Sequence, residues 1–350
     1  MTIRELATHC GVSNATVSLA LRGHPRISPA TRERIARMAE DLGYRANPLV
    51  SALLTHVRAR QSPRFQEVLG VLSTQALPGR RQTPYNRAVI EGIIDRVAHL
   101  GFGVDFFPAD GSVGARRLDQ VLASRGIRGL IIDPSCQDAP VPELAWENLS
   151  CVRMTYAPAE RRARRVLPDQ YHNMEDLLQE LDARGYRRIG FYNLARFEDR
   201  VHGHWSAAFI RYQFDLPARR RVPLKLSEDW RHDAFVAWAR RTRPDAIVCP
   251  HWGAAAWLRE AGFSVPEEIG VAAPNWSPLH PQVGGIDQNA ADIGAAAVDI
   301  VASQLSRNEA GLQTKPRLTL IPGQFREGAT LRPRPVPAPR SALSDARVLG

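Results

Sequence analysis

The first 22 residues constrain the fold most, because they hold two short helical patterns separated by a glycine turn. Thr2 and Glu5 have the spacing of a capping box, which starts a helix almost at the first residue. Gly11 ends this helix and supplies the left-handed residue that a tight turn needs. Ser13 caps a second helix. The apolar residues of that helix recur at i, i+3 and i+4 and face inward: Val17, Ala20 and Leu21. The pattern predicts a helix-turn-helix whose second helix enters the major groove of DNA.

The second helix turns the other side chains of its N-terminal half outward, where a recognition helix usually reads base edges. The predicted DNA contacts from this region are Ser13, Asn14, Ala15, Thr16, Ser18, Leu19 and Arg22. Asn14 can pair bidentately with adenine, whereas Ala15 and Leu19 offer only apolar contact, for example to a thymine methyl group. The alternative is a small helical hairpin that does not bind DNA.

A third helix is expected from Ser28-Pro29, because serine is a good N-cap and proline suits the first helical position. Its apolar residues follow a helical period and end at Gly43: Ile35, Met38, Ala39 and Leu42. A second start signal, Asn47-Pro48, precedes an apolar segment too short to be a stable helix alone in water. Such a segment is best explained if DNA and a second copy of the chain stabilise it.

These residues resemble the LacI/GalR family of bacterial transcription regulators over about 55 residues without a gap. The matching residues are Thr2-Ile3, Leu6-Ala7, Gly11-Val12-Ser13, Thr16-Val17-Ser18, Leu21, Thr31-Arg32, Ile35, Leu42-Gly43-Tyr44 and Asn47. The resemblance implies a homodimer on a roughly palindromic operator, with a hinge helix in the minor groove. It implies DNA contacts from Asn47 and from Leu53, the leucine that wedges between base pairs. The chain departs from the family at its base-reading positions, and Ala46 stands where many members have a hinge proline.

The charge of the chain suits a polyanion partner, because the formal net charge is +10. Residues 1–60 hold nine arginines and four acids, which predicts salt-sensitive DNA binding. Genome composition is an alternative source of part of this charge, since lysine occurs only at Lys225 and Lys315. The four scattered cysteines indicate reduced, mostly buried thiols and a cytoplasmic protein. No signal peptide and no run of 18 apolar residues is found, so we expect no membrane association.

From Glu67 onward, short apolar runs alternate with helical patterns. The expected strands cover residues 68–72, 103–107, 129–132, 151–155, 188–192, 246–249 and 269–272. The expected helices cover residues 88–100, 114–125, 171–184, 200–212, 234–241, 254–261 and 290–304. Two βα-repeating halves predict parallel sheets and ligand binding beyond the strand carboxyl ends, in a cleft between two lobes. The family resemblance likewise implies a periplasmic-binding-protein-like core.

The sequence therefore predicts an all-α head joined by a hinge helix to a two-lobed α/β core. The predicted boundaries are 1–46 for the helix-turn-helix domain, 47–64 for the hinge helix and linker, and 65–331 for the effector-binding and dimerisation domain. Residues 332–350, rich in proline and arginine, are expected to form a disordered tail.

A sugar or nucleobase effector needs a few polar groups on apolar or aromatic walls. The resemblance, together with the chain's own polar and aromatic residues, gives these candidates: Tyr85, Asp169, Arg200, His251, Trp252 and Asn275. Asn275 stands for a family aspartate, His251-Trp252 for an Asn-Asp pair, and Arg200 aligns one residue away from the family position. These departures indicate either an unusual effector or the loss of sensing. The alternatives are helix capping by Asp169, a surface position for Arg200, a neutral loop histidine at His251 and packing for the aromatic residues.

Metal binding and catalysis find no support in the motifs. His202-Gly203-His204 has the appearance of a metal motif, but side chains at i and i+2 of a helix point apart. GxSxG, GxGxxG, GxxxxGK[ST] and HExxH do not occur. We therefore expect no metal, no cofactor and no enzyme, but a dimeric transcription regulator, most simply a repressor, controlled by a sugar-like effector. The rivals are a repressor whose cleft senses nothing, and an enzyme or binding protein with an accessory DNA-binding head.

Overall fold

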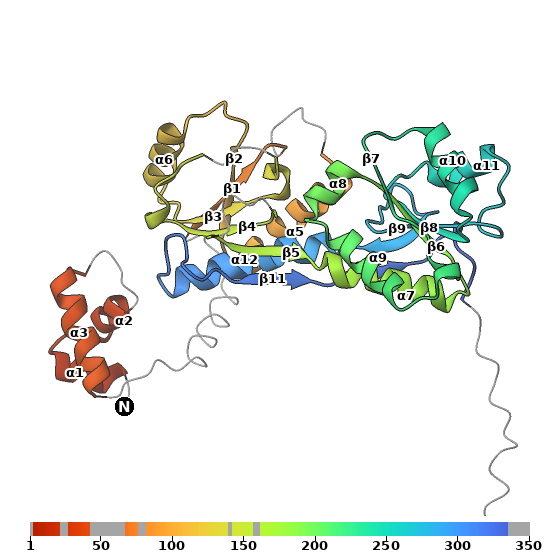
Figure 1. Ribbon diagram of the computed structural model, residues 1–350. Coiled ribbons are helices and arrows are strands. Elements are labelled where there is room, and N and C mark those ends of the chain that lie inside the picture. Colours follow the sequence, from red (N-terminus) through yellow and green to blue (C-terminus); the bar gives the residue numbers. More distant parts are fainter. Residues whose placement is uncertain are drawn as a thin grey trace, which may run out of the picture. The chain divides into compact units, whose positions relative to one another are not determined.

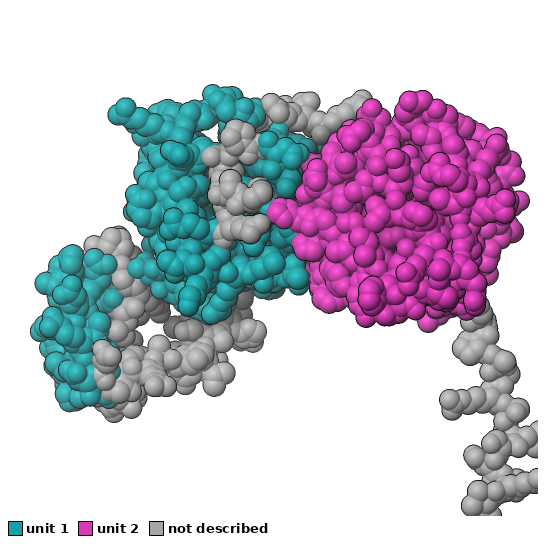
Figure 2. Space-filling model, viewed as in Figure 1, with its two compact units in different colours: residues 1–167, 290–320 teal, residues 168–289, 321–350 magenta. Residues whose placement is uncertain are grey.

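The computed structural model describes residues 3–21, 27–42, 67–75, 82–138, 142–156 and 162–334 (Figure 1). The chain divides into two compact units, residues 1–167 with 290–320 and residues 168–289 with 321–350 (Figure 2). The predicted hinge and linker, residues 47–64, lie outside the described residues.

Three N-terminal helices pack around a small core of their own. They are α1 (Ile3–Cys10), α2 (Asn14–Leu21) and α3 (Pro29–Asp41). Of the predicted apolar residues, Val17, Ala20, Ile35 and Ala39 are buried in this core, and Met38 and Leu42 pack against it. The other buried members are Leu6, Ala7 and Cys10. Gly11 has a left-handed φ of 64°, and the amide of Val12 donates to the carbonyl of Ala7 over 3.1 Å. This hydrogen bond closes the end of α1, so the predicted glycine turn is confirmed.

The first unit contains a six-stranded sheet in the order β11-β5-β4-β3-β1-β2. Its strands are β1 (Val68–Ser73), β2 (Gly103–Pro108), β3 (Gly129–Ile132), β4 (Ser150–Arg153), β5 (Arg164–Pro168) and β11 (Leu318–Ile321). Strands β1 to β5 pair in parallel, as predicted. Its helices are α5 (Pro84–Leu100), α6 (Ala115–Ser124) and α12 (Ala290–Ser306), with short 3-10 turns η1 (Pro134–Cys136) and η2 (Trp146–Asn148).

The second unit repeats this architecture, with the strand order β12-β10-β9-β8-β6-β7. Its strands are β6 (Ile189–Leu194), β7 (Lys225–Ser227), β8 (Ala246–Val248), β9 (Gly270–Ala273), β10 (Gly284–Asp287) and β12 (Gln324–Arg326). Its helices are α7 (Gln170–Ala183), α8 (Ala195–Arg200), α9 (His204–Phe214), α10 (His232–Thr242) and α11 (Ala254–Glu260), with a 3-10 turn η4 (Ala218–Arg220). All these strands pair in parallel except β12, which is antiparallel to β10.

The helix predicted over residues 200–212 is present as α9, but its predicted start is wrong, because the chain breaks at His202 and Gly203. These residues have left-handed φ values of 54° and 71°, which end α8 and start α9 in a new direction. Arg200 is therefore the last residue of α8 and not an early residue of the next helix. His202 and His204 lie on either side of a turn and not on one helix. Their i, i+2 spacing is therefore no reason against metal binding.

Two smaller differences concern the ends of elements. Helix α5 begins four residues before its predicted start, because Pro84 stands at its first position and the hydroxyl of Thr83 accepts from the amide of Asn86 over 3.2 Å. Helix α8 and strands β5, β7, β10, β11 and β12 were not predicted, and all are short.

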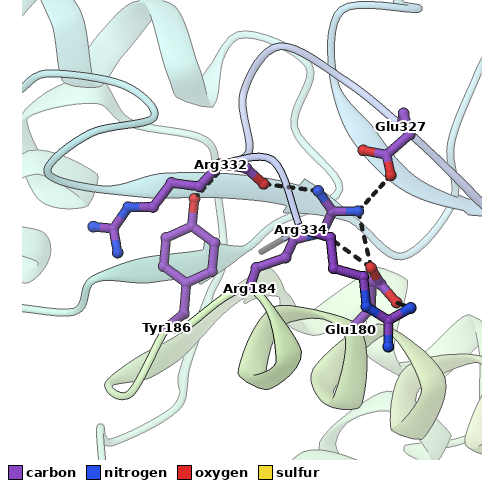
Figure 3. A network of polar contacts seen from close by, with 6 residues as sticks. All are labelled: Glu180, Arg184, Tyr186, Glu327, Arg332 and Arg334. Carbon is purple, nitrogen blue, oxygen red and sulfur yellow. Dashed lines mark hydrogen bonds and ion pairs between the residues drawn. The ribbon is translucent and has the colours of Figure 1, made fainter. Parts of the chain in front are cut away.

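The predicted tail begins too early, since residues 332–334 belong to the second unit (Figure 3). The amide of Arg332 donates to the Tyr186 hydroxyl over 2.9 Å, and its carbonyl accepts from Arg184 over 2.7 Å. The Arg184 guanidinium also donates to Glu180 and Glu327. This network fixes the chain beside the end of α7; residues 335–350 lie outside the described part.

Candidate functional site

The N-terminus of α2 is built as a recognition helix requires. The Ser13 hydroxyl accepts from the amide of Thr16 over 3.1 Å, so the predicted cap is confirmed. Val17 is fully buried against α1 and α3, whereas Ser13 is exposed and Thr16 and Leu19 are partly exposed. The side chains of Asn14, Ala15 and Ser18, and all of Arg22, Asn47 and Leu53, lie outside the described residues. Their DNA contacts stay predictions.

The carboxyl edge of the first sheet holds a buried carboxylate, Asp133, directly after β3. Its Oδ1 accepts from the Ser135 amide over 2.9 Å and from the Ser135 hydroxyl over 2.5 Å. Its Oδ2 is buried and has no hydrogen-bond partner among the described residues. Burial raises the pKa of Asp133, although hydrogen bonds from Ser135, Ser73 and Cys136 favour its ionised form. A polar ligand at this edge could supply the missing partner.

The start of α5 adds polar groups to the same edge, because this helix follows β1. Asn86 donates through Nδ2 to Gln75 Oε1 over 2.7 Å. Tyr85 lies in the first turn of α5 and is half-buried, and burial together with nearby Tyr156 raises the pKa of its hydroxyl. The structure thus places Tyr85, a predicted effector residue, at the carboxyl edge of β1.

The carboxyl edge of the second sheet holds Asn275 and Trp276, just after β9. Asn275 Oδ1 and Trp276 Nε1 are buried without a hydrogen-bond partner in the described ranges. Beside them, Gln170 Oε1 accepts from Trp205 Nε1 over 2.7 Å and from Gln288 Nε2 over 3.1 Å. Gln288 Nε2 also lies 3.4 Å from the carbonyl of Pro274. One polar chain therefore joins α7, α9 and β10 to the loop that carries Asn275.

His251 and Trp252 stack against other rings of the same unit. The His251 ring centroid lies 4.8 Å from that of Trp230 and 4.2 Å from that of Trp257. Burial lowers the pKa of His251, which keeps the imidazole neutral. Trp252 stacks on His280 with centroids 5.0 Å apart. These contacts favour packing and a neutral histidine over a charged contact to a ligand.

Asp169 and Arg200 take structural positions. Asp169 caps α7, because its carboxylate accepts from the His172 amide over 3.3 Å and lies 2.8 Å from His172 Nδ1. This pairing raises the pKa of His172. Arg200 is exposed at the end of α8. Asp169 therefore caps a helix, which was the alternative to its contact with an effector. Arg200 lies at the surface, which was the alternative for that residue.

Sequence reasoning missed Asp133, Gln75 and Asn86 as candidate ligand contacts. One usable signal was a polar residue directly after an apolar strand, as in Asp133 after β3, since ligands bind at that edge of parallel sheets. Tertiary packing buries Asp133 Oδ2 without a hydrogen-bond partner among the described residues, and no pattern in the sequence predicts this.

Two negative findings apply to the described ranges alone. No helix there is long and apolar enough to cross a membrane. No group of three or more His, Cys, Asp or Glu side chains there is placed to hold a metal ion.

Comparisons with known proteins match both parts of the chain. The model "Bacterial regulatory proteins, lacI family" matches residues 2–47, and "Periplasmic binding protein-like domain" matches residues 178–331. Catabolite control protein A of Priestia megaterium is 40% identical over 322 residues, which cover 88% of this chain and 93% of that protein.

Two further comparisons are more limited. The HTH-type transcriptional regulator PtxS of Pseudomonas plecoglossicida is 30% identical over 191 residues, but the match covers only 54% of this chain and 52% of PtxS. A solved "transcriptional regulator CelR-cellobiose complex" superposes with a TM-score of 0.53 at 19% identity. That superposition covers 94% of this chain and 99% of the solved chain, and it supports the fold alone.

Proposed function

Because the chain belongs to the LacI family of bacterial regulatory proteins, we propose that it represses transcription as a homodimer on a palindromic operator and responds to a sugar-like effector. As a member of this family it is a DNA-binding transcription regulator and not an enzyme. The operator symmetry, the repressor role, the dimer and the effector class are the proposed parts.

The single observation that supports base recognition by this chain is the packing and capping of helix α2. Its inner face is buried against α1 and α3, and its N-terminus is capped by an exposed Ser13. The cap leaves the first turn of α2 rigid, so its outward side chains can meet base edges in a fixed register. A dimer would present two such helices about one helical turn of DNA apart, which motivates the palindromic operator.

The effector is proposed to bind polar groups at the carboxyl edge of the second sheet. Asn275 Oδ1 and Trp276 Nε1 are buried polar atoms that lack partners among the described residues. A polyhydroxylated ligand can donate to the Asn275 oxygen and accept from the indole N–H. Asn275 is uncharged, so an uncharged sugar or sugar derivative fits this edge of the second unit better than a cationic ligand does.

Regulation is proposed to act by linkage. The effector would stabilise one arrangement of the lobes and so shift the population of hinge segments that can fold as helices in the minor groove. A helix over residues 47–54 would be too short to be stable alone in water, so its formation would depend on DNA and a second chain, which would make the segment switchable.

A repressor without sensing is the second candidate, and one observation favours it. His251 and Trp252 both stack on rings of the protein itself, so two of the predicted effector residues already have aromatic partners. An effect of any small molecule on operator affinity would exclude this candidate.

Selection of duplexes from a random library tests the proposed function. The purified chain should enrich one sequence with two inverted half-sites, and its complex with that duplex should contain two protein chains. Enrichment of an asymmetric site by a single chain would contradict both the dimer and the palindromic operator.

A further inference from the structure

Eight arginines gather at one edge of the second unit, where β6, β7 and β8 begin. We call them the arginine face: Arg187, Arg188, Arg219, Arg220, Arg221, Arg240, Arg241 and Arg243. Arg187 and Arg188 precede β6, Arg219 to Arg221 precede β7, and Arg240 to Arg243 lie between the last turn of α10 and β8. This edge is opposite to the one that holds Asn275, because β6 to β9 are parallel.

Hydrogen bonds show that three segments of the face lie side by side. The Arg188 guanidinium donates to the carbonyls of Arg219, Thr242 and Arg243, with 2.7 Å to Thr242 and 3.0 Å to Arg243. Arg220 Nε donates to the carbonyl of Arg187 over 2.9 Å. Arg188 and Arg220 therefore tie the segments before β6, β7 and β8 together, and the arginines form one surface.

The carboxylates near the face do not neutralise it. Asp182 Oδ1 lies 2.9 Å from Arg187 Nη1 and 2.8 Å from Arg220 Nη2, so two arginines share one acid. Asp245 accepts from the backbone amides of Arg187 and Arg188 over 2.7 and 2.8 Å. Eight arginines against these two aspartates leave a surplus of six positive charges.

Helix capping explains only part of the cluster. Arg188, Arg221 and Arg240 donate to carbonyls near the ends of α10, α9 and α11, where a cation is favourable. Arg219, Arg241 and Arg243 are exposed, and within the described ranges their guanidinium groups form no hydrogen bond or ion pair. These three arginines repel one another, and no carboxylate among the described residues pairs with them to offset that repulsion.

Several arginines elsewhere in the chain are paired with carboxylates. Arg96, Arg125, Arg128 and Arg326, for example, each pair with a carboxylate at 2.7 to 3.0 Å. Exposed arginines without a carboxylate partner among the described residues also occur elsewhere, as at Arg116 and Arg117. At the arginine face, however, three of them lie on segments that the hydrogen bonds of Arg188 hold together.

We propose that the arginine face binds the phosphate backbone of a DNA segment that the helix-turn-helix does not contact. Guanidinium groups recognise phosphate oxygens bidentately, and a duplex presents a charge about every 1.7 Å along its axis, which suits several arginines on different loops. The face belongs to the second unit and the recognition helix to residues 14–21, so the two surfaces are separate. The chain would then hold two DNA segments, or one segment at two places.

The sequence at the end of the chain does not match this face in charge. Arg332 is fixed on Tyr186 and Arg184, beside the segment that carries Arg187 (Figure 3). The residues that follow include Arg340 and Arg347 and a single acid, Asp345. The net side-chain charge of residues 335–350 is therefore positive and does not complement the face.

The test compares two triple variants of the full chain. Arg219→Gln, Arg241→Gln and Arg243→Gln together remove three charges from the face, whereas Arg116→Gln, Arg117→Gln and Arg317→Gln remove three exposed charges from the first unit. Affinity for a random-sequence duplex is measured against salt concentration. The face variant should lower the slope of log K against log[salt] by about 2 to 3, since each phosphate contact contributes about 0.9. The control should keep the slope of the native chain.

Chemical protection then places the contact and separates DNA from a protein partner. The duplex should protect Arg219, Arg241 and Arg243 from phenylglyoxal, and a glutamate-rich peptide at equal charge should protect them less. An unchanged salt slope, equal slopes for the two triple variants, or stronger protection by the peptide would each overturn the proposal. Because the recognition helix is intact in both variants, selection of the operator should still succeed, so failure here leaves the proposed function standing.

Discussion

At the residue scale, the buried carboxylate of Asp133 lowers the stability of the folded chain when it is ionised. Its buried Oδ2 lacks a partner among the described residues, and burial raises the pKa of the carboxyl group. The folded chain therefore binds this proton more tightly than the unfolded chain does. Stability should fall as the pH rises from the usual carboxyl range, about 3.9, to the raised pKa, and should stay lower above it.

Asp133→Asn should remove that pH dependence. The amide oxygen keeps an acceptor for the Ser135 N–H, while the buried charge is lost. We expect a higher free energy of unfolding at neutral pH and a flatter profile, measured by urea unfolding across the pH range. Exposed Asp95 offers the control Asp95→Asn, which should leave the profile unchanged. A profile that keeps its slope in Asp133→Asn would show that another group causes it.

Asn14 is the residue on which base reading is predicted to depend most. Asn14→Ala removes a bidentate partner for adenine, so discrimination at one base position in each half-site should fall by about 1–3 kcal/mol. The duplex selection described above, repeated with this variant, measures the change position by position. The same base preference in both chains would mean that Asn14 contacts only the backbone or nothing.

Gly203 sets the boundary between two elements, α8 and α9. Its φ of 71° is left-handed, a conformation that costs other residues roughly 1–2 kcal/mol. Gly203→Ala should therefore lower the free energy of unfolding by about that amount. Gly114, the N-cap of α6, has a φ of −65° and open space at its Cβ position, so Gly114→Ser, which keeps a capping residue there, is a control that should cost little. Equal stability of the two variants in urea unfolding would contradict the strain argument.

The same break explains why sequence reasoning failed at this element. Val201, Trp205, Ala208 and Phe209 keep a helical spacing across the break and all join one core cluster, so periodicity hides the turn. The three helices of the head were predictable because their caps at Ser13 and Ser28 are local hydrogen bonds. Strands such as β7 and β12 have three residues each and partly exposed side chains, which leaves no apolar pattern to read.

The candidate site was harder to predict than the fold. The alternation of strands and helices predicts which loops lie at the carboxyl edges of the sheets. The loops near Tyr85, His251 and Asn275 could therefore be identified from the sequence. The role of each side chain depends on partners far away in the sequence, as when Trp230 and Trp257 enclose His251. Such contacts form only in the folded chain.

The hinge is the element on which specific binding should depend, although Leu53 lies outside the described residues. If Leu53 wedges between base pairs, Leu53→Ala removes the contact that repays DNA bending. Affinity for the selected operator should then fall far more than affinity for a random duplex. Fluorescence anisotropy on the two duplexes at one salt concentration measures both. An equal loss on both would place Leu53 outside the minor groove.

At the scale of the whole molecule, sensing requires that one ligand changes both the stability and the operator affinity. A ligand present at 100 times its dissociation constant should stabilise the folded chain by about 2.7 kcal/mol, so a thermal-melt screen of sugars, sugar phosphates and nucleobases should reveal it. Binding linkage is reciprocal, so a regulatory ligand must also bind with different affinity when operator is present.

Asn275→Ala tests whether a ligand found in that screen binds at Asn275, because it removes a buried oxygen that has no hydrogen-bond donor among the described residues. The variant should lose the thermal shift, whereas Asn148→Ala, at an exposed position of the first unit, should keep it. A ligand that shifts all three chains equally binds elsewhere and would remove Asn275 from the site. A ligand that shifts melting but leaves operator affinity unchanged would favour the repressor without sensing, since binding would then be uncoupled from DNA. If the ligand changes both quantities and Asn275→Ala abolishes both changes, the carboxyl edge of the second sheet is the place where the effector signal begins.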